Sequence, residues 1–277
     1  ANVRIGNGSS ELLQMACYAF GGAGRRIAYP YPSFSMYGVY ANLADSEAAP
    51  FPLDVEGFVD PKVVIDFCKE QQPALLIICN PNNPTGNYNP LAAMEEIIAN
   101  VDCPVIMDEA YMEFARGSGV DAQDLRPLSK LKLVAGSTLS LTGKYSNFMV
   151  FRTFSKAYGL AGMRCGYAVG SAVMMRILGK TLLPYHVNGY SLMVAESCYQ
   201  HRDAYKEIQD DIISQRDIFA GELASLGMQV YPSATNFLCC TPAGELRERL
   251  AANSDEEFGR DNNYSQATKA GKYIFKN

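Results

Sequence analysis

Residues 74–80, ALLIICN, and residues 104–110, PVIMDEA, are two short runs that are almost entirely apolar until polar residues end them. Such runs are typical of strands buried on both faces, as in a parallel sheet. Between them, residues 91–101, LAAMEEIIANV, have the apolar spacing of a helix. Two strands joined by a crossover helix form a βαβ unit. These residues therefore predict an α/β fold with helices on both faces of the sheet.

The same alternation of strand and helix extends in both directions from this unit. Further strands are expected at residues 2–6, 25–30, 147–153 and 166–170, and further helices at 11–20 and 34–44. Residues 115–146 predict a surface hairpin, because the runs LKLVA (131–135) and STLSLTG (137–143) alternate around a glycine.

The pattern changes in the last third of the chain. Residues 187–226 predict a long amphipathic helix that ends at Gly227. Strands at 228–241 and a short helix at 243–252 are expected to follow. We therefore expect a large domain, residues 1–205, and a smaller, partial domain, residues 206–277.

The composition narrows the classes of function. The 277 residues are 48% hydrophobic and 19% charged, which is ordinary for a globular protein with a sizeable core. A net charge of −5 argues against nucleic acid, which needs a basic face. No apolar run is long enough to span a bilayer, and residues 1–20 lack the basic and apolar segments of a signal peptide. We expect a cytoplasmic protein with small-molecule partners.

The eight cysteines lie mostly inside apolar runs. They show no CxxC spacing and do not cluster with the two histidines, His186 and His201. The pattern predicts buried free thiols and neither a disulfide scaffold nor a zinc site.

Five polar or aromatic clusters follow strand-like runs, at the positions where open α/β sheets bind ligands. They are GNGSSE (6–11), YPYPSFSMY (29–37), NPNNPTG (80–86), VIMDEAYMEF (105–114) and RTFSKAYGLAGMR (152–164). Each has an ordinary structural explanation. The first could be a helix cap or a phosphate site, the second core packing or an aromatic plate, and the third a plain turn or an amide that binds a ligand.

The last two clusters contain groups that are costly to bury. Asp108 ends an apolar strand, where a carboxylate needs a cation, donors or a metal. A metal would need more ligands than Asp108 and Glu109, and the sequence shows none nearby. Lys156 is either a surface amine or a desolvated nucleophile. Taken together, the clusters supply what pyridoxal 5′-phosphate requires: donors for a phosphate, a plate for a ring, a carboxylate for the ring nitrogen, and an amine for the aldehyde.

With LPYHVN (183–188), these stretches resemble the fold type I pyridoxal-phosphate aminotransferases, and most closely their histidinol-phosphate aminotransferase group. Order and spacing agree from about residue 3 to 240. The resemblance implies a mostly parallel seven-stranded sheet sandwiched by helices, with a smaller, incomplete C-terminal α+β domain. It also implies a homodimer, a role in histidine biosynthesis, an amino donor and a 2-oxo acid acceptor such as 2-oxoglutarate.

The resemblance also implies roles for single residues. Lys156 would form the Schiff base and take the substrate's α-proton, and Asp108 would pair with the ring nitrogen. Tyr111 and Asn83 would bond the phenolic oxygen. The remaining cofactor contacts would be Phe34 on the ring and Ser9, Ser10, Thr153, Ser155 and Arg164 on the phosphate, and the substrate contacts would be Asn188 and Asn236.

The chain departs from the family's pattern in places. Family members carry an arm before the glycine-serine stretch and a carboxylate-binding arginine after Asn236, and neither is found here. Position 10 is Ser where Asp is usual, and residues 117–146 are longer than expected. The chain is therefore expected to be a fragment or a divergent member. Two other readings stay open: a lyase similar to threonine-phosphate decarboxylase, and a degenerate protein that binds the cofactor without turnover.

Overall fold

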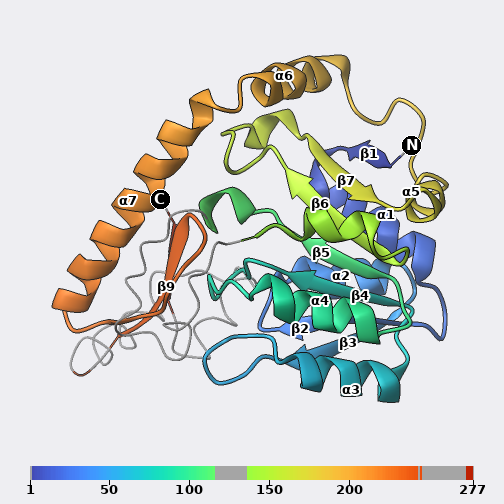
Figure 1. Ribbon diagram of the computed structural model, residues 1–277, viewed down its shortest axis with the longest axis horizontal. Helices are drawn as coiled ribbons and strands as arrows, with labels where there is room; N and C mark the ends of the chain where they lie inside the picture. Colours follow the sequence, from blue (N-terminus) through green and yellow to red (C-terminus); the bar gives the residue numbers. More distant parts are fainter. Residues whose placement is uncertain (1, 116–135, 243, 245–272, 277) are drawn as a thin grey trace, which may run out of the picture.

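A seven-stranded sheet forms the centre of the computed structural model, which describes residues 2–115, 136–242, 244 and 273–276 (Figure 1). Its order is β1-β7-β6-β5-β4-β2-β3. Neighbouring strands from β3 to β6 are parallel, whereas β7 runs antiparallel to both β6 and β1. The expected mostly parallel seven-stranded sheet is confirmed. The strands are β1 (Val3–Gly6), β2 (Arg26–Tyr31), β3 (Glu47–Pro52), β4 (Leu75–Cys79), β5 (Val105–Asp108), β6 (Phe148–Thr153) and β7 (Gly166–Gly170).

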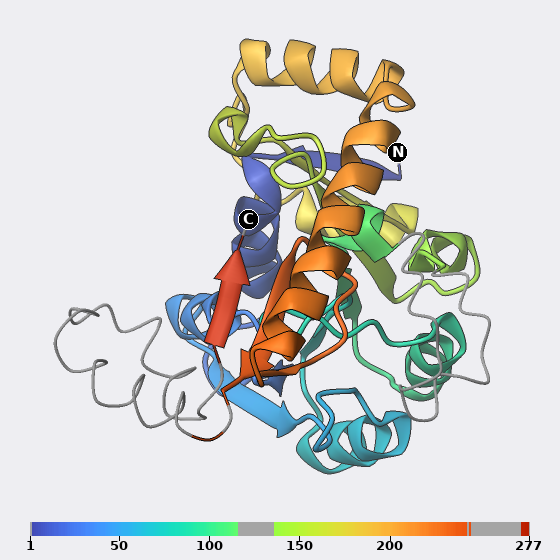
Figure 2. The ribbon, with the colours of Figure 1, turned by 90° about the vertical axis from the view of Figure 1, so that its left-hand side faces the viewer.

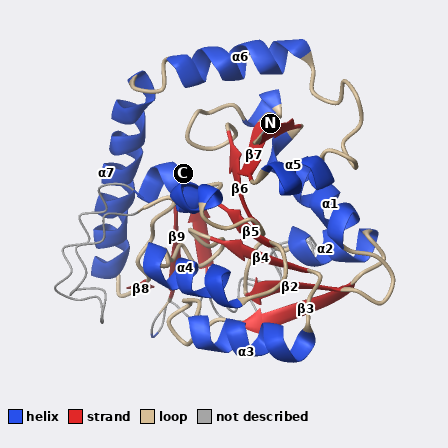
Figure 3. Cartoon of the chain, turned by 45° about the vertical axis from the view of Figure 1, so that its right-hand side comes forward, coloured by secondary structure: helices blue, strands red, loops and turns tan. Residues whose placement is uncertain are grey.

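Helices cover both faces of this sheet (Figure 3). One face packs on α1 (Gly8–Phe20), α2 (Met36–Leu43) and α5 (Ala172–Leu178), and the other on α3 (Pro61–Gln71), α4 (Leu91–Asn100) and the 3₁₀ helix η3 (Thr138–Gly143). Strand β4 shows why its sequence is continuously apolar. Leu75 and Ile77 point into the first core, while Leu76 and Ile78 point into the second.

Most of the predicted elements in residues 1–170 are present, with small shifts at their ends. The largest shift is at α1, which begins at Gly8 rather than at residue 11. Among the strands and α-helices before residue 187, three were not predicted: β3, α3 and α5.

The C-terminal elements form a second, antiparallel sheet of three strands in the order β10-β9-β8, with α7 beside it (Figure 2). They are α6 (Gly189–Gln200), α7 (Ala204–Ser225), β8 (Gln229–Val230), β9 (Phe237–Thr241) and β10 (Tyr273–Lys276). No helix in the described ranges is long and apolar enough to cross a membrane. The proposed domain boundary after residue 205 falls in the first turn of α7 and stays a prediction.

The prediction of one long helix over residues 187–226 is wrong, because a turn at residues 201–203 separates α6 from α7. The turn contains the backbone hydrogen bond from Ala204 N to His201 O, 3.0 Å long. The reason lies in what each helix contacts. Helix α6 packs near the 3₁₀ helix η4 (Ala161–Met163), whereas α7 packs on β8, β9 and the 3₁₀ helix η1 (Met112–Ala115). A single straight helix would not reach both.

The surface hairpin predicted in residues 115–146 is also wrong over residues 136–146, the part that the structure describes beyond residue 115. Residues 137–143 are not a strand, since η3 occupies 138–143 and its Thr138 and Leu141 are buried. Ser137 caps it by accepting a hydrogen bond from Leu139 N at 3.1 Å. The other half of the hairpin, 131–135, lies outside the described residues, as does the helix predicted at 243–252 apart from residue 244.

Candidate active site

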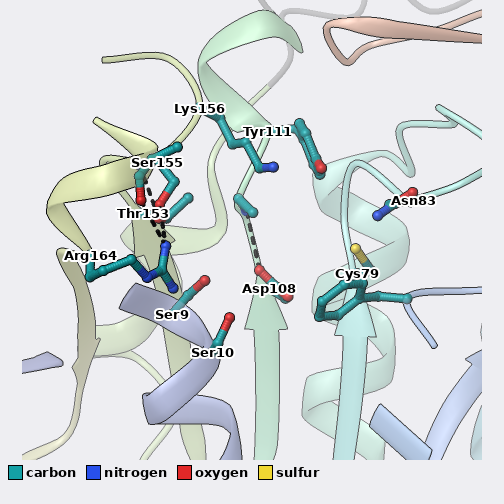
Figure 4. Close-up of a pocket in the computed structure, with 13 residues that line it drawn as sticks. Ser9, Ser10, Cys79, Asn83, Asp108, Tyr111, Thr153, Ser155, Lys156 and Arg164 are labelled. Atoms are coloured by element: carbon teal, nitrogen blue, oxygen red, sulfur yellow. Dashed lines mark hydrogen bonds between the residues drawn. The ribbon is translucent and has the colours of Figure 1, made fainter. Parts of the chain in front are cut away.

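A pocket opens where β4, β5 and β6 end and α1 begins (Figure 4). All ten residues predicted to contact a cofactor line it, although they come from distant parts of the chain. They are Ser9, Ser10, Phe34, Asn83, Asp108, Tyr111, Thr153, Ser155, Lys156 and Arg164, and Cys79, Ala110 and Ala161 complete the lining.

One side of the pocket is built for an anion, and we call Ser9, Ser10, Thr153, Ser155 and Arg164 the anion subsite (Figure 4). Ser9 and Ser10 lie in the first turn of α1, where backbone N–H groups lack helical partners and the helix dipole favours negative charge.

Arg164 brings the cationic group to this subsite. Its Nη1 donates to Ser155 Oγ at 3.4 Å and to Ala161 O at 3.1 Å. Thr153 Oγ1 accepts from Ser155 N at 3.1 Å, which fixes the turn after β6. Gly8 leaves the space that the guanidinium uses, because a Cβ there would lie 2.5 Å from Arg164 Nη2.

Asp108 ends β5 on the floor of the pocket (Figure 4). Its Oδ2 accepts from Tyr37 Oη at 2.8 Å, and its Oδ1 accepts from Ala110 N at 3.2 Å. Burial raises its pKa to about 6, against the lowering effect of these donors and of the Lys156 charge. A buried carboxylate that remains ionised at neutral pH suits a cationic ring nitrogen.

Lys156 and Tyr111 face each other above this carboxylate (Figure 4). The Lys156 Nζ lies 5.4 Å from the centroid of the Tyr111 ring. Burial, and then the nearby Cys79 and Asp108, raise the pKa of Tyr111, so its hydroxyl is a hydrogen-bond donor at neutral pH.

The asparagines of NPNNPTG divide into two kinds. Asn80 and Asn82 are buried and hold the loop: Asn80 Nδ2 donates to Asn89 O at 2.9 Å, and Asn82 Nδ2 donates to Pro32 O at 3.1 Å. Asn83 is half-buried and lines the pocket instead. The loop therefore holds Asn83 at the side of the pocket opposite the anion subsite (Figure 4).

Glu109, the neighbour of Asp108, belongs to a buried cluster of charges and not to a metal site. Its Oε2 accepts from Arg152 Nε at 2.8 Å, and its Oε1 accepts from Thr138 N at 2.7 Å. Arg152 Nη1 also reaches Glu113 Oε1 at 2.8 Å. In the part of the chain that the structure describes, no three His, Cys, Asp or Glu side chains gather in a way that could hold a metal.

Asn188 and Asn236, the predicted substrate contacts, are not among the residues that line the pocket. Asn188 caps α6, since its Oδ1 accepts from Ser191 N at 2.8 Å. Asn236 is half-buried just before β9. Their roles toward a substrate stay predictions.

Sequence reasoning missed two residues of the site. Cys79 lines the pocket, and burial raises its pKa to about 12, so its thiol stays protonated. Tyr37 lies behind Asp108. Neither could be selected from the sequence, because one ends an apolar strand and the other lies in an aromatic stretch that core packing explains.

The described residues fit pyridoxal 5′-phosphate. The first turn of α1 and Arg164, which Gly8 leaves room for, can hold an anion. The buried Asp108 can face a ring nitrogen, and Lys156 can reach an aldehyde. The fold and pocket together define a protein suited to bind a phosphorylated aromatic ligand next to a lysine.

The comparisons with known proteins agree with this class. The family model described as aminotransferase class I and II matches residues 1–260. The chain therefore belongs to the class I and II aminotransferase family.

Among sequence relatives, the histidinol-phosphate aminotransferase of Clostridium novyi is 33% identical over 252 residues, which are 90% of this chain and 65% of that protein. The chain thus spans less than two thirds of that relative's length. Two solved structures share the fold: a histidinol-phosphate aminotransferase from Sinorhizobium meliloti in complex with pyridoxal-5′-phosphate (TM-score 0.76, 23% identity, 92% of this chain and 66% of that one), and an L-threonine-O-3-phosphate decarboxylase from Porphyromonas gingivalis (TM-score 0.75, 20% identity, 100% and 78%).

Proposed function

We propose that this chain is the cofactor-binding part of a pyridoxal-phosphate-dependent aminotransferase. Its donor would be an amino acid or an amino-alcohol phosphate of the histidinol-phosphate kind, and its acceptor a 2-oxo acid such as 2-oxoglutarate, which would place it in histidine biosynthesis. One observation carries the proposal: a lysine, a buried carboxylate and an anion subsite line the same pocket. Family membership and the names of the relatives support it.

Each residue has a physical task in this reaction. Arg164 and the start of α1 would hold the phosphate group through charge and N–H donors. Phe34 would cover the ring. Asp108 would keep a proton on the ring nitrogen, because its negative charge lies in a buried site where it acts strongly. When bound, the cofactor supplies an aldehyde that carries the amino group and a ring that accepts electrons.

Lys156 would have two tasks. Its amine lines the pocket and would bond to the aldehyde carbon of the cofactor. Once the donor has displaced it, the same amine would take the proton from the donor's α-carbon and deliver it to the cofactor's carbon. Tyr111, held with its ring edge-to-face on Phe237 at 5.2 Å, would donate a hydrogen bond to the phenolic oxygen together with Asn83. Asn188 and Asn236 are proposed as substrate contacts.

The test is an absorption spectrum of the purified chain with added pyridoxal phosphate, recorded beside Lys156→Ala. We expect a visible band in the wild type that borohydride bleaches, and no such band in the variant. A folded wild type without this band would overturn the proposal. Lys180→Ala is the control, because this lysine is not among the pocket residues and its loss should leave the band unchanged.

A decarboxylase is the second candidate, because the Porphyromonas gingivalis structure covers the whole chain. That similarity is at the level of the fold, whereas the sequence relative is an aminotransferase by name. The products separate them: glutamate formed from 2-oxoglutarate indicates transamination, and carbon dioxide indicates a lyase. A chain that binds the cofactor and turns over neither substrate would be the degenerate member.

We also propose a cytoplasmic homodimer. The loop before α6 and α6 itself expose several large apolar side chains: Leu183, Tyr185, Tyr190 and Met193 are between 67% and 100% exposed. A second copy would remove them from water. All eight cysteines are free thiols, as a reducing compartment would keep them. Sedimentation velocity should show a dimer that Tyr190→Glu dissociates, and a monomer at all concentrations would contradict it.

A further inference from the structure

Tyr37 is a buried phenol whose hydroxyl is directed at the pocket carboxylate. Its side chain is fully buried, and its Oη donates to Asp108 Oδ2 at 2.8 Å. It lies in the first turn of α2 and is not among the residues that line the pocket. It therefore reaches the site only through other side chains.

The surroundings keep Tyr37 a donor. Burial, then the charge of Asp108, raise the pKa of the phenol well above its ordinary value, so it stays protonated at any physiological pH. A neutral donor fixed against a buried carboxylate favours the charged form of that carboxylate and sets its orientation. The titratable groups whose charges or hydrogen bonds act on Asp108 are Tyr37, Tyr40, Cys79, Glu109, Tyr111 and Lys156.

The ring of Tyr37 has a separate contact. It packs edge-to-face on Phe34, with the centroids 5.5 Å apart and the planes at 83°. Phe34 lines the pocket, as Asp108 does. Tyr37 thus contacts two parts of the pocket: its ring packs on Phe34, and its hydroxyl bonds to Asp108.

We propose that Tyr37 is a positioning residue, whose hydroxyl holds Asp108 ionised and oriented toward the ligand while its ring sets the place of Phe34. The inference rests on the proposed function for what the ligand is, but the bond to Asp108 exists without it. Tyr37 is not expected to contact the cofactor itself, because it lies behind the residues that line the pocket.

Tyr37→Phe separates the two tasks, because it removes the hydroxyl and keeps the ring. In the ligand-free protein, the Asp108 carboxyl is followed by ¹³C NMR against pH, with Asp108→Asn identifying the signal. We expect Tyr37→Phe to raise the pKa of Asp108 by about one pH unit, since a hydrogen bond to a charged group is lost. Tyr29→Phe is the matched control: its ring lies 6.1 Å from that of Tyr37, and its hydroxyl does not bond Asp108.

Cofactor affinity is the second readout, measured by absorbance titration with pyridoxal phosphate at pH 8. Tyr37→Phe should weaken binding about tenfold, Tyr37→Leu further because the contact with Phe34 is also lost, and Tyr29→Phe not at all. An unchanged Asp108 pKa in Tyr37→Phe would overturn the inference, whatever its effect on stability. A wild type that binds no cofactor would overturn the proposed function instead, and the NMR titration would still decide the role of Tyr37.

Discussion

Asp108 and Glu109 are neighbours in the sequence, both are buried, and their surroundings differ completely. Glu109 has a cation, Arg152, and accepts further bonds from Ser137 Oγ at 2.7 Å and Thr138 Oγ1 at 2.7 Å. Asp108 accepts hydrogen bonds from two uncharged donors and faces a pocket. Because successive residues of an extended chain point to opposite sides, Asp108 at the end of β5 faces the pocket, while Glu109 just after it joins the buried cluster of charges.

The difference shows that burial alone does not mark a functional carboxylate. A buried charge that is fully paired stabilises an arrangement of elements, in this case β5, β6 and η3. A buried carboxylate whose hydrogen-bond donors are neutral, and whose pKa is raised by burial, is stabilised when a cationic group of a ligand binds beside it.

The largest effect is expected on the Glu109 side. Arg152→Met removes the cation that pairs with the buried Glu109 and with Glu113, and we expect a loss of about 3–5 kcal/mol in the free energy of unfolding. Urea denaturation measures it. Arg26→Met is the control, because its ion pair with Glu47 is exposed and should contribute about 1 kcal/mol or less. Equal losses in the two variants would contradict the comparison, and Arg152→Met with Glu109→Gln should recover part of the stability.

The next effect has the opposite sign and concerns Asp108. Its pKa rises from 3.8 to about 6 in the fold, so the folded state binds the proton more tightly than the unfolded chain. The stability that this proton supplies is present below about pH 4 and is lost as the pH rises through 6. Asp108→Asn should therefore make the ligand-free protein more stable at pH 7, by about 3 kcal/mol.

The pH profile checks that explanation. Urea denaturation of the wild type and Asp108→Asn should show a difference that is largest above pH 6 and disappears near pH 4. The variant should also lose the proposed transamination, because the ring nitrogen would have no carboxylate. A variant that is less stable than the wild type at pH 7 would show that Asp108 is a structural group like Glu109.

The smallest effect tests the anion subsite. Gly8→Ala would place a Cβ 2.5 Å from Arg164 Nη2, at a φ of +79° that is strained for alanine, so the guanidinium must move. We expect cofactor affinity to fall about tenfold, as for one charge-assisted hydrogen bond. Gly24→Ala has a similar φ of +73° with nothing within 4 Å, so both variants should lose about 1 kcal/mol of stability, and only Gly8→Ala should lose affinity. Similar cofactor affinities in the two variants would show that Arg164 does not contribute to the anion subsite.

The pocket lining could be predicted because its members follow apolar strands and carry polar groups that are costly there, as Asp108 and Lys156 do. Their individual roles needed the family resemblance. The structure adds which asparagine of NPNNPTG faces the pocket, since Asn80 and Asn82 are buried and bond within the loop region, whereas Asn83 lines the pocket. Sequence spacing does not contain that information.

Other features could not be predicted, for related reasons. Tyr37 acts through a bond to a residue far along the chain, and its sequence surroundings are those of any packed aromatic. The turn at 201–203 lies in a stretch of continuous helical composition, and what separates α6 from α7 is that they pack on different elements. Such choices are made by tertiary contacts rather than by local propensity.

The antiparallel strand β7 gives the site a position in the order of folding. Gly6 of β1 is the register partner of Gly166 of β7, and a Cβ at Gly166 would lie 2.5 Å from Ser9 N. The anion subsite thus joins the first residues of the chain to residues beyond 160, and it exists only after that very long loop has closed. Loop closure over such a separation is slow and entropically costly. During synthesis, all the parallel strands, β2 to β6, leave the ribosome before Arg164 does. The chain can therefore bind a phosphate only after these strands have been made.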